Sequence, residues 1–193
     1  LLMSHVKTRE PTDLAWPPLL MLQHYLPNRK QSDIARLHDI WAKYQPRERP
    51  LRGRQRHSKR VVFVSGDLGN HPVGFFCVPL FAGLKRRGYE LHLFDSRPKP
   101  DPTQVKLYGC ASGVTNISKL SDEVVFESIR ELEAGFAFDL SGHTRGSRLS
   151  LFAKRIAHYQ MTAYGYVNTT RLPAMDGILS DPYQILESEE MSY

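Results

Sequence analysis

The chain has 193 residues, of which 41% are hydrophobic and 24% are charged. This predicts one packed domain, or one domain with an arm, and excludes a disordered protein. It has no run of about 18 apolar residues, so no membrane partner is expected. The start, "LLMSHVKTRE", lacks the pattern of a signal peptide and does not begin with Met, which fits a piece of a longer protein. Its two cysteines, Cys77 and Cys110, show no disulfide or metal spacing, which favours a reducing compartment, the cytoplasm or the nucleus.

The net charge of +6 comes from one segment of the chain. Residues 47–60, "RERPLRGRQRHSKR", hold seven Lys or Arg and one Glu, so the rest of the chain is neutral. We interpret this segment as a solvated connector, and the alternative is a strip that binds phosphates or nucleic acid. The strip has no aromatic residue on which a base could stack, so nucleic acid is not an expected partner.

The first part of the chain predicts a helical arm. Residues 11–31 are rich in Pro and have no clean periodicity, whereas residues 32–44 predict an amphipathic helix capped by Ser32. His38 lies beside the apolar stripe of this helix, and we expect it to be structural. The stripe consists of Ile34, Leu37, Trp41 and Tyr44.

From residue 60 onward, strand and helix patterns alternate. Gly88 is expected to end the first helix, and Pro79 removes one hydrogen bond inside it. Strands are predicted at 60–65, 89–95, 113–118, 136–142, 160–166 and 176–181. Helices are predicted at 73–87, 102–111, 121–134 and 147–155, the third of them with Val124, Val125, Ile129 and Leu132 near its apolar face.

This order of elements predicts an α/β fold, a Rossmann-like doubly wound parallel sheet. The sheet domain would span 60–193, after a helical arm and basic linker at 1–59. Ligands bind such sheets at the carboxyl ends of the strands. The loops on this expected functional edge are 65–72, 95–101, 141–147 and 166–174.

The first of these loops, "SGDLGNHP", carries a histidine just before a helix. Gly66 and Gly69 allow a tight turn, and Pro72 suits the first helical position. An imidazole at His71 can transfer protons near neutral pH. The alternative is that Asn70 or His71 merely caps the helix. The dinucleotide fingerprint G-x-G-x-x-G is absent.

The second loop, "DLSGHTRGSRL", holds a compact set of hydrogen-bond donors between two glycines. These donors are His143, Thr144 and Arg145. The guanidinium of Arg145 suits a carboxylate or phosphate, although it could pair with Asp139 or Asp67 instead.

The third loop, at 165–176, offers Asn168, Thr169 and Thr170. Such side chains suit sugar hydroxyls and equally suit any polar turn. The common position of the three loops on one sheet edge is a stronger signal than any single loop.

Taken together, these segments resemble the catalytic region of the O-GlcNAc transferase / SPINDLY family. The motifs "SGDLGNHPVGFF", "DLSGHTRGSRLSLFAKR", "GYVNTT", "LPAMD" and "LSDPY" occur in the order and spacing of that region. The arm segment "LPNRKQSDIARLHDIWAKY" resembles the helical segment between the family's tetratricopeptide repeats and its catalytic region. The resemblance covers roughly residues 20–186.

The resemblance implies a GT-B glycosyltransferase, in which two Rossmann-like lobes enclose the active-site cleft. Members transfer GlcNAc from UDP-GlcNAc, or fucose from GDP-fucose in the SPINDLY branch, to Ser or Thr of intracellular acceptor proteins, with no metal and no other cofactor. His71 matches the histidine of the family's "HP" motif, which lines the cleft and is assigned as a proton acceptor. We assign substrate-binding roles to Asp67, Asn70, His143, Thr144, Arg145, Thr169 and Thr170.

Two features depart from the family pattern. The loop that usually reads "GYPGTTG" is "GYVNTTR" here, so Val167, Asn168 and Arg171 replace Pro, Gly and Gly. A side chain in place of Gly would crowd the cleft or force a different turn. The sequence also ends where the family continues into a second lobe, which holds most nucleotide contacts. We therefore expect an N-terminal catalytic lobe that is inactive by itself, and the alternative is a non-catalytic remnant that binds a protein partner through an apolar cleft face.

Overall fold

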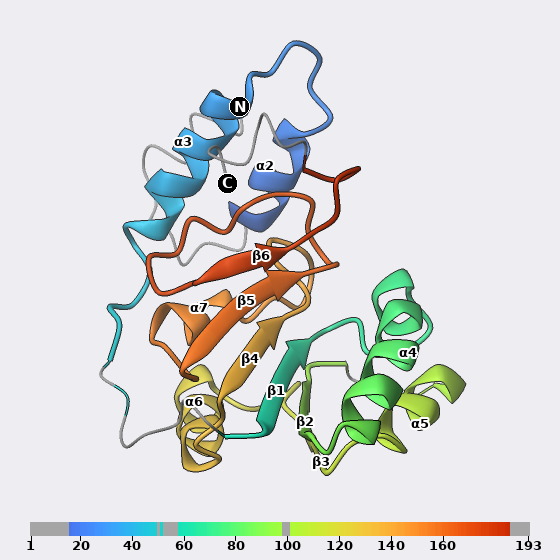
Figure 1. The fold of residues 1–193 in the computed structure, drawn as a ribbon. Helices are drawn as coiled ribbons and strands as arrows, with labels where there is room; N and C mark the ends of the chain where they lie inside the picture. The colour runs from blue at the N-terminus through green and yellow to red at the C-terminus, as the bar shows by residue number, and fades with distance from the viewer. Residues whose placement is uncertain (1–15, 50, 52–57, 98–100, 186–193) are drawn as a thin grey trace.

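The computed structural model describes residues 16–49, 51, 58–97 and 101–185. Its centre is a wholly parallel sheet with the strand order β3-β2-β1-β4-β5-β6 (Figure 1). The strands are β1 Arg60–Ser65, β2 Glu90–Asp95, β3 Gly113–Asn116, β4 Phe136–Asp139, β5 Tyr159–Ala163 and β6 Gly177–Leu179. The order reverses between β1 and β4, as in a Rossmann-like doubly wound sheet. The predicted fold class is confirmed.

Strand β1 lies inside the sheet because both of its faces are apolar. Val61 and Phe63 belong to one core cluster, whereas Val62 and Val64 belong to the other. Side chains alternate between the two faces of a strand, so a continuous apolar run fits a strand that is buried on both sides. Its backbone is also enclosed, since β1 pairs with β2 on one side and with β4 on the other.

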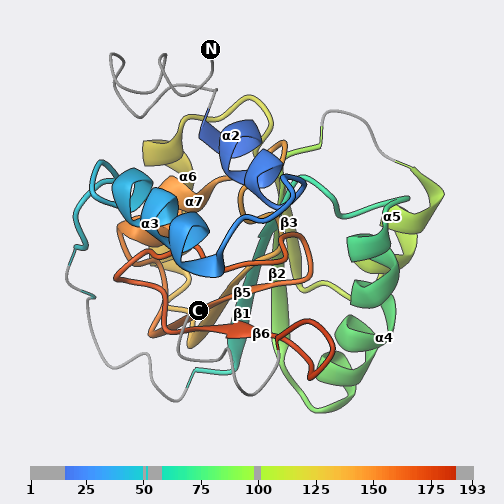
Figure 2. The ribbon, with the colours of Figure 1, turned by 90° about the horizontal axis from the view of Figure 1, so that it is seen from above.

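Helices cover both faces of the sheet. One face is covered by α4 (Pro72–Arg86) and α5 (Pro102–Tyr108), and the other by α6 (Asp122–Glu131) and α7 (Leu149–Ala153) (Figure 1, Figure 2). The arm provides α2 (Trp16–Gln23) and α3 (Gln31–Ala42), which lie above the arrowhead ends of β4, β5 and β6 (Figure 1). Both arm helices share the core cluster of α6 and α7, through Trp16, Leu19, Leu20 and Trp41.

Local signals in the sequence account for several helix ends. The Ser121 hydroxyl accepts a hydrogen bond from the N–H of Val124 at 3.4 Å and caps α6. Gly88, with φ of +75°, follows α4 in the left-handed conformation that glycine adopts freely, as predicted. The capping box of Asp101 and Gln104 starts α5.

Other details of the arm and of α6 differ from the prediction. Helix α3 begins at Gln31 with Lys30 as its N-cap, so the predicted cap at Ser32 is wrong. The predicted apolar faces are narrower than expected, because Tyr44 is 60% exposed and Val124 is 52% exposed. Helix α2 was not predicted at all. Its two prolines stand in the first turn, where a missing N–H breaks no helical hydrogen bond.

The described ends of the basic segment are held at the surface by ion pairs. Arg49 lies 2.8 Å from Glu123, and Arg60 lies 3.2 Å from Glu90. The rest of the proposed binding strip, residues 50 and 52–57, lies outside the described residues, as do 1–15 of the predicted arm and 186–193 of the predicted lobe.

Among the residues that the structure describes, no helix combines the length and the apolar character needed to cross a membrane.

Candidate functional site

The loops that follow β1, β2 and β4 meet where the strand order reverses. The backbone N–H of Gly66 donates to Oγ of Ser141 at 3.1 Å. A Cβ atom on Gly66 would lie 3.2 Å from the carbonyl oxygen of Arg145, so the two loops are in close backbone contact. Ser96 joins them by donating to the carbonyl of Gly146 at 3.0 Å. Doubly wound sheets bind ligands at this meeting point, and we call the residues around it the crevice.

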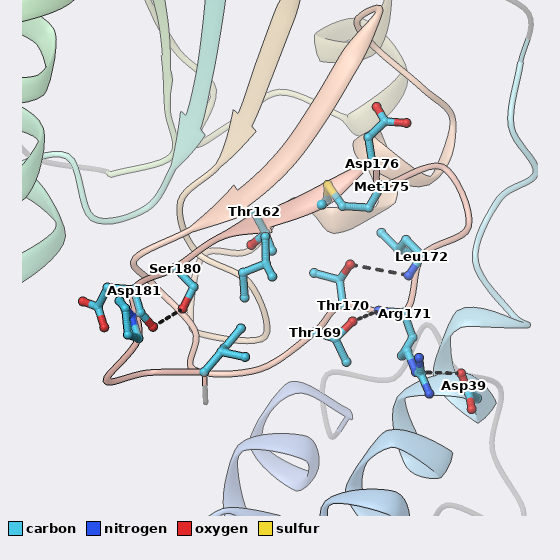
Figure 3. Close-up of a pocket in the computed structure, with 14 residues that line it drawn as sticks. Asp39, Thr162, Thr169, Thr170, Arg171, Leu172, Met175, Asp176, Ser180 and Asp181 are labelled. Carbon is cyan, nitrogen blue, oxygen red and sulfur yellow. Dashed lines mark hydrogen bonds and ion pairs between the residues drawn. The ribbon is translucent and has the colours of Figure 1, made fainter. Parts of the chain in front are cut away.

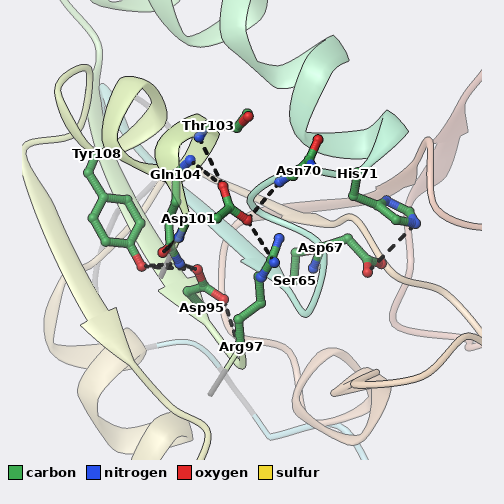
Figure 4. Close-up of polar contacts among 10 residues, drawn as sticks. All are labelled: Ser65, Asp67, Asn70, His71, Asp95, Arg97, Asp101, Thr103, Gln104 and Tyr108. Carbon is green, nitrogen blue, oxygen red and sulfur yellow. Dashed lines mark hydrogen bonds and ion pairs between the residues drawn. The ribbon is translucent and has the colours of Figure 1, made fainter. Parts of the chain in front are cut away.

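His71 is both a helix cap and an exposed side chain of this crevice. Its Nδ1 accepts a hydrogen bond from the N–H of Val73 at 3.3 Å. The side chain is 45% exposed, and its Nε2 lies 3.9 Å from Oδ1 of Asp67 (Figure 4). The cap occupies one ring nitrogen and leaves the other at the surface. The interpretation of His71 as a helix cap is therefore confirmed.

A network from the loop after β2 holds the His71 loop in position (Figure 4). The carboxylate of Asp101 accepts hydrogen bonds from the N–H groups of Asn70 at 2.8 Å and Thr103 at 2.9 Å. The same carboxylate pairs with Arg97 at 2.7 Å. Gly69 faces this pair so closely that a Cβ atom there would lie 1.9 Å from the Arg97 guanidinium. The sequence placed 95–101 on the functional edge but gave no role to Asp101, although Asp before Pro at a helix start was an available signal.

Asp95 supports the same loop from inside the protein. It is fully buried and accepts hydrogen bonds from the N–H of Arg97 at 2.7 Å, from the Tyr108 hydroxyl at 3.0 Å and from the Gln104 amide. Burial raises the pKa of Asp95, and these donors lower it in part. Because its oxygens are occupied by fixed donors, Asp95 is a structural group.

Asp67 differs from Asp95 in its hydrogen bonding. Its side chain is 19% exposed. Removal from water raises the pKa of Asp67. The electrostatic interactions with His71 and Arg97 lower this pKa, and the negative charge of Asp95 raises it. Its backbone N–H donates to Oγ of Ser65 at 3.0 Å, but no donor among the described residues forms a hydrogen bond to its carboxylate.

Asp139 shapes the loop after β4 and explains why this strand ends earlier than predicted. Its carboxylate accepts hydrogen bonds from the N–H groups of Ser141 at 3.2 Å and Gly142 at 2.8 Å, and from the Thr162 hydroxyl at 2.8 Å. Complete burial raises the pKa of Asp139 to about 6. Gly142 has φ of +54°, and a Cβ atom there would lie 2.2 Å from Tyr166. Only glycine fits this turn.

The three predicted donors of this loop have different environments. Arg145 is exposed and, within the described residues, forms no ion pair with Asp139 or Asp67, so the alternative pairing is not formed. The Thr144 hydroxyl donates to the carbonyl of Ser141 at 2.7 Å. His143 lies in the interior instead.

His143 packs against the arm. It is 1% exposed, and its ring centroid lies 4.3 Å from that of Trp41 and 5.0 Å from that of His38. Burial lowers the pKa of His143 well below its ordinary value, so the ring is neutral. His38 is also buried, with Nε2 2.8 Å from the Tyr166 hydroxyl, which agrees with the structural role predicted for it. The structure therefore buries His143 against α3 instead of exposing it at the edge of the sheet.

Thr169 and Thr170 line a pocket of about 890 Å³ beside β6 (Figure 3). Both hydroxyls serve the turn itself, because they accept hydrogen bonds from the N–H groups of Arg171 at 3.1 Å and Leu172 at 3.4 Å. No residue of the His71 loop lines this pocket. The predicted residues thus lie around His71, in the interior at His143, and along this pocket at Thr169 and Thr170.

The unusual side chains of the third loop turn toward the arm. Arg171 has φ of +54°, a conformation that glycine adopts freely, and its guanidinium lies 3.2 Å from Asp39 of α3 (Figure 3). Asn168 is buried, and its Oδ1 accepts a hydrogen bond from the Gln31 side-chain amide at 2.9 Å. Val167 is 52% exposed. Arg171 and Asn168 therefore connect the loop to α3.

The described part of the chain has no cluster of three or more His, Cys, Asp or Glu side chains that could hold a metal ion.

Several proteins are similar to this chain, although no family model matches it. The chain is 25% identical over 126 residues to a protein of Arabidopsis thaliana named probable UDP-N-acetylglucosamine–peptide N-acetylglucosaminyltransferase SEC. It is 28% and 36% identical to the correspondingly named SPINDLY proteins of Petunia hybrida and Hordeum vulgare. These matches cover 63–64% of this chain but 13% of each relative. The chain therefore spans a small part of the curated relatives' length.

A solved structure is similar over nearly the whole chain. A mutant O-GlcNAc transferase of Thermobaculum terrenum superposes with a TM-score of 0.84 and 27% identity. The superposition covers 93% of this chain and 36% of that one. Together, the sequence and structure comparisons bear out the resemblance that the linked motifs indicated.

Proposed function

We propose that this chain is the N-terminal lobe of a protein O-glycosyltransferase, because it is related to the O-GlcNAc transferase / SPINDLY family of GT-B glycosyltransferases. The reaction transfers GlcNAc from UDP-GlcNAc to Ser or Thr of acceptor proteins, with GDP-fucose as the alternative donor and with no metal. The observation that carries the proposal is the superposition of almost the whole chain on one part of a solved O-GlcNAc transferase.

The crevice around His71 supports a catalytic role for this lobe. His71 is held at the start of α4 with one ring nitrogen at the surface, and Asp67 faces that nitrogen. The loop is braced by Asp101 and Arg97, which limits its movement. Such bracing is what a group that must meet a substrate precisely requires. Asn70, Thr144 and Arg145 are proposed to bind substrate at the same edge.

In this proposal the chain does not transfer sugar by itself, because a GT-B site needs both lobes. Incubation with radiolabelled UDP-GlcNAc and an acceptor protein should give no transfer above that of His71→Ala. Transfer above that control would contradict the proposed dependence on a second lobe. GDP-fucose in a parallel reaction tests the alternative donor.

A chimera tests the catalytic role directly. In it, this chain replaces the matching part of wild-type Thermobaculum terrenum O-GlcNAc transferase. The chimera should transfer GlcNAc, and His71→Ala should lower the rate by at least about 100-fold. His71→Asn is the matched control, because Asn also caps a helix and so keeps α4 stable while removing the imidazole. A folded chimera in which both variants are as active as the parent would overturn the role of His71.

A second candidate function, protein binding without catalysis, is favoured by exposed aromatic side chains near the crevice. Phe75 and Phe76, in the first turn of α4, are 53% and 59% exposed. The ring of Phe76 lies 5.7 Å from that of Tyr164, in the loop after β5. An apolar surface of this kind serves either a second lobe or a partner protein. A folded but inactive chimera would favour the partner protein.

A further inference from the structure

The hydrogen bond that caps α4 determines which nitrogen of His71 carries a proton. The N–H of Val73 donates to Nδ1 at 3.3 Å, so Nδ1 must hold a lone pair. A neutral imidazole has a single ring proton, which is then on Nε2. His71 therefore presents an N–H group, and not a lone pair, to the crevice. A neutral His71 in this geometry cannot accept a proton on Nε2.

The carboxylate of Asp67 lies on the side that this N–H faces. Its Oδ1 is 3.9 Å from Nε2 of His71. Three neighbouring aspartates, Asp95, Asp101 and Asp139, each use their carboxylate to accept several hydrogen bonds from fixed donors. Within the described residues, the Asp67 carboxylate accepts none, so its lone pairs remain available.

We propose that Asp67, and not His71, is the proton acceptor of this pair, and that His71 is a fixed hydrogen-bond donor that positions it. The groups that face Asp67 are His71, Arg97 and Asp95. Partial burial supports the assignment, because desolvation makes a carboxylate easier to protonate. The 3.9 Å separation is longer than a hydrogen bond, and contacts of this kind often shorten when substrate is bound.

This inference rests on the proposed function and specifies its proton transfer. The Ser or Thr hydroxyl of the acceptor gives its proton to the Asp67 carboxylate as its oxygen bonds the anomeric carbon of the sugar. The bond from that carbon to the phosphate oxygen breaks, and its electron pair leaves with the nucleoside diphosphate. The proton on Asp67 is then released to solvent.

Nitrogen NMR of the whole 193-residue chain tests the position of the proton on His71. Long-range ¹H–¹⁵N spectra of neutral His71 should show one fixed tautomer, with Nδ1 unprotonated and Nε2 protonated. Asp67→Asn should leave this tautomer unchanged, because the Val73 N–H sets it. A protonated Nδ1, or an exchanging mixture of both tautomers, would overturn the inference.

Carbon NMR tests whether Asp67 is the group that accepts a proton. The carboxyl signal of Asp67 should titrate above the ordinary value of 3.8, and in His71→Asn it should titrate higher still, because the electrostatic interaction with His71, which lowers the pKa of Asp67, is lost. Asp101 is the internal control, since its hydrogen bonds hold its pKa below the ordinary value. Titration of Asp67 at or below 3.8 would overturn the inference. Neither NMR measurement needs transferase activity. An inactive chimera would contradict the proposed function, and the NMR spectra would still test the protonation of His71 and Asp67.

Discussion

Single residues decide where the loops of the crevice can approach one another. Gly74, in α4, packs against the loop that precedes it, and a Cβ atom there would lie 2.1 Å from the carbonyl oxygen of Gly69. Gly83 is in the same helix, but the nearest atom to its Cβ would be a flexible Arg87 side chain at 3.6 Å. The two glycines therefore differ in packing and share the same secondary structure.

Replacing each glycine by Ala separates packing from helix propensity. Gly74→Ala should lower the free energy of unfolding by about 2 kcal/mol, because backbone atoms must shift to admit the methyl group. Gly83→Ala should raise it by about 0.5–1 kcal/mol, because Ala favours a helix more than Gly does. Urea denaturation of both variants measures the difference. Equal effects at the two sites would contradict the close contact at Gly74.

Arg171 is a second position where the residue type affects stability, because its backbone conformation is strained for any residue except glycine. Its φ of +54° disfavours a residue with a Cβ atom, and its ion pair with Asp39 is partly exposed. Partly exposed pairs contribute only about 0–1 kcal/mol. The strain and the ion pair are thus of similar size and opposite sign.

The variants Arg171→Gly and Arg171→Ala test this balance. Arg171→Gly should leave the free energy of unfolding within about 0.5 kcal/mol of the parent, because the relieved strain offsets the lost ion pair. Arg171→Ala keeps the strain and loses the pair, so it should be about 1 kcal/mol less stable than Arg171→Gly. Thermal unfolding of the two variants side by side measures this gap. An Ala variant as stable as the Gly variant would argue against backbone strain at this position.

At the scale of elements, the arm contacts the loop after β5 through one buried and one partly buried histidine. His24 and His38 both contact the Tyr166 hydroxyl, at 3.0 Å and 2.8 Å. Burial lowers the pKa of His38 from 6.5 to about 4, and it lowers that of His24 as well. Both rings are therefore neutral in the folded protein near pH 7. The attachment of α2 and α3 depends on that neutrality.

Acid should weaken this attachment. Between pH 6.5 and about 4, unfolded His38 binds a proton that the folded chain rejects, so the free energy of unfolding falls as the pH falls. The loss from His38 alone is roughly 3 kcal/mol over this range. Chemical denaturation at several pH values can follow Trp16 and Trp41, the two tryptophans of the chain, which both lie in the arm helices.

His38→Gln is the control for this pH dependence. The Gln side chain does not titrate near neutral pH and can still bond the Tyr166 hydroxyl. The His38→Gln variant should therefore show a smaller change in the free energy of unfolding between pH 6.5 and about 4. An unchanged slope would assign the pH dependence to other groups.

At the scale of the whole molecule, apolar side chains remain exposed at the carboxyl edge of the sheet. Phe75, Phe76 and Val167 are each more than half exposed, and Tyr164 contacts Phe76. Most of the remaining large apolar side chains are buried in the two clusters on either face of the sheet.

Dye binding measures this exposed surface. The chain should bind the apolar dye ANS while it is folded, and the double variant Phe75→Asn with Phe76→Asn should reduce the fluorescence at least about twofold, because the patch loses two rings. Val105→Asn is the matched control, since Val105 is 69% exposed but lies on α5. A larger loss with Val105→Asn would place the apolar surface elsewhere.

Much of the fold could be predicted because its signals are local. The apolar run of β1 and the capped pattern of α6 identify their elements within about ten residues. Helix α2 was missed because tertiary packing, and not periodicity, stabilises "WPPLLMLQ" against the sheet. The ends of β4 depended on the contacts of one buried carboxylate, Asp139, which no pattern displays.

For the site, the sequence by itself determined the loop, the histidine and the edge of the sheet where they lie. The alternation of strands and helices and the linked motifs were sufficient, because parallel strands bring the ends of separate segments to one edge. Only the tertiary structure decided that His143 is buried, that Asp101 braces the His71 loop, and that the N–H of Val73 bonds Nδ1 of His71. Those outcomes depend on distances between residues, which a linear pattern of residue types does not contain.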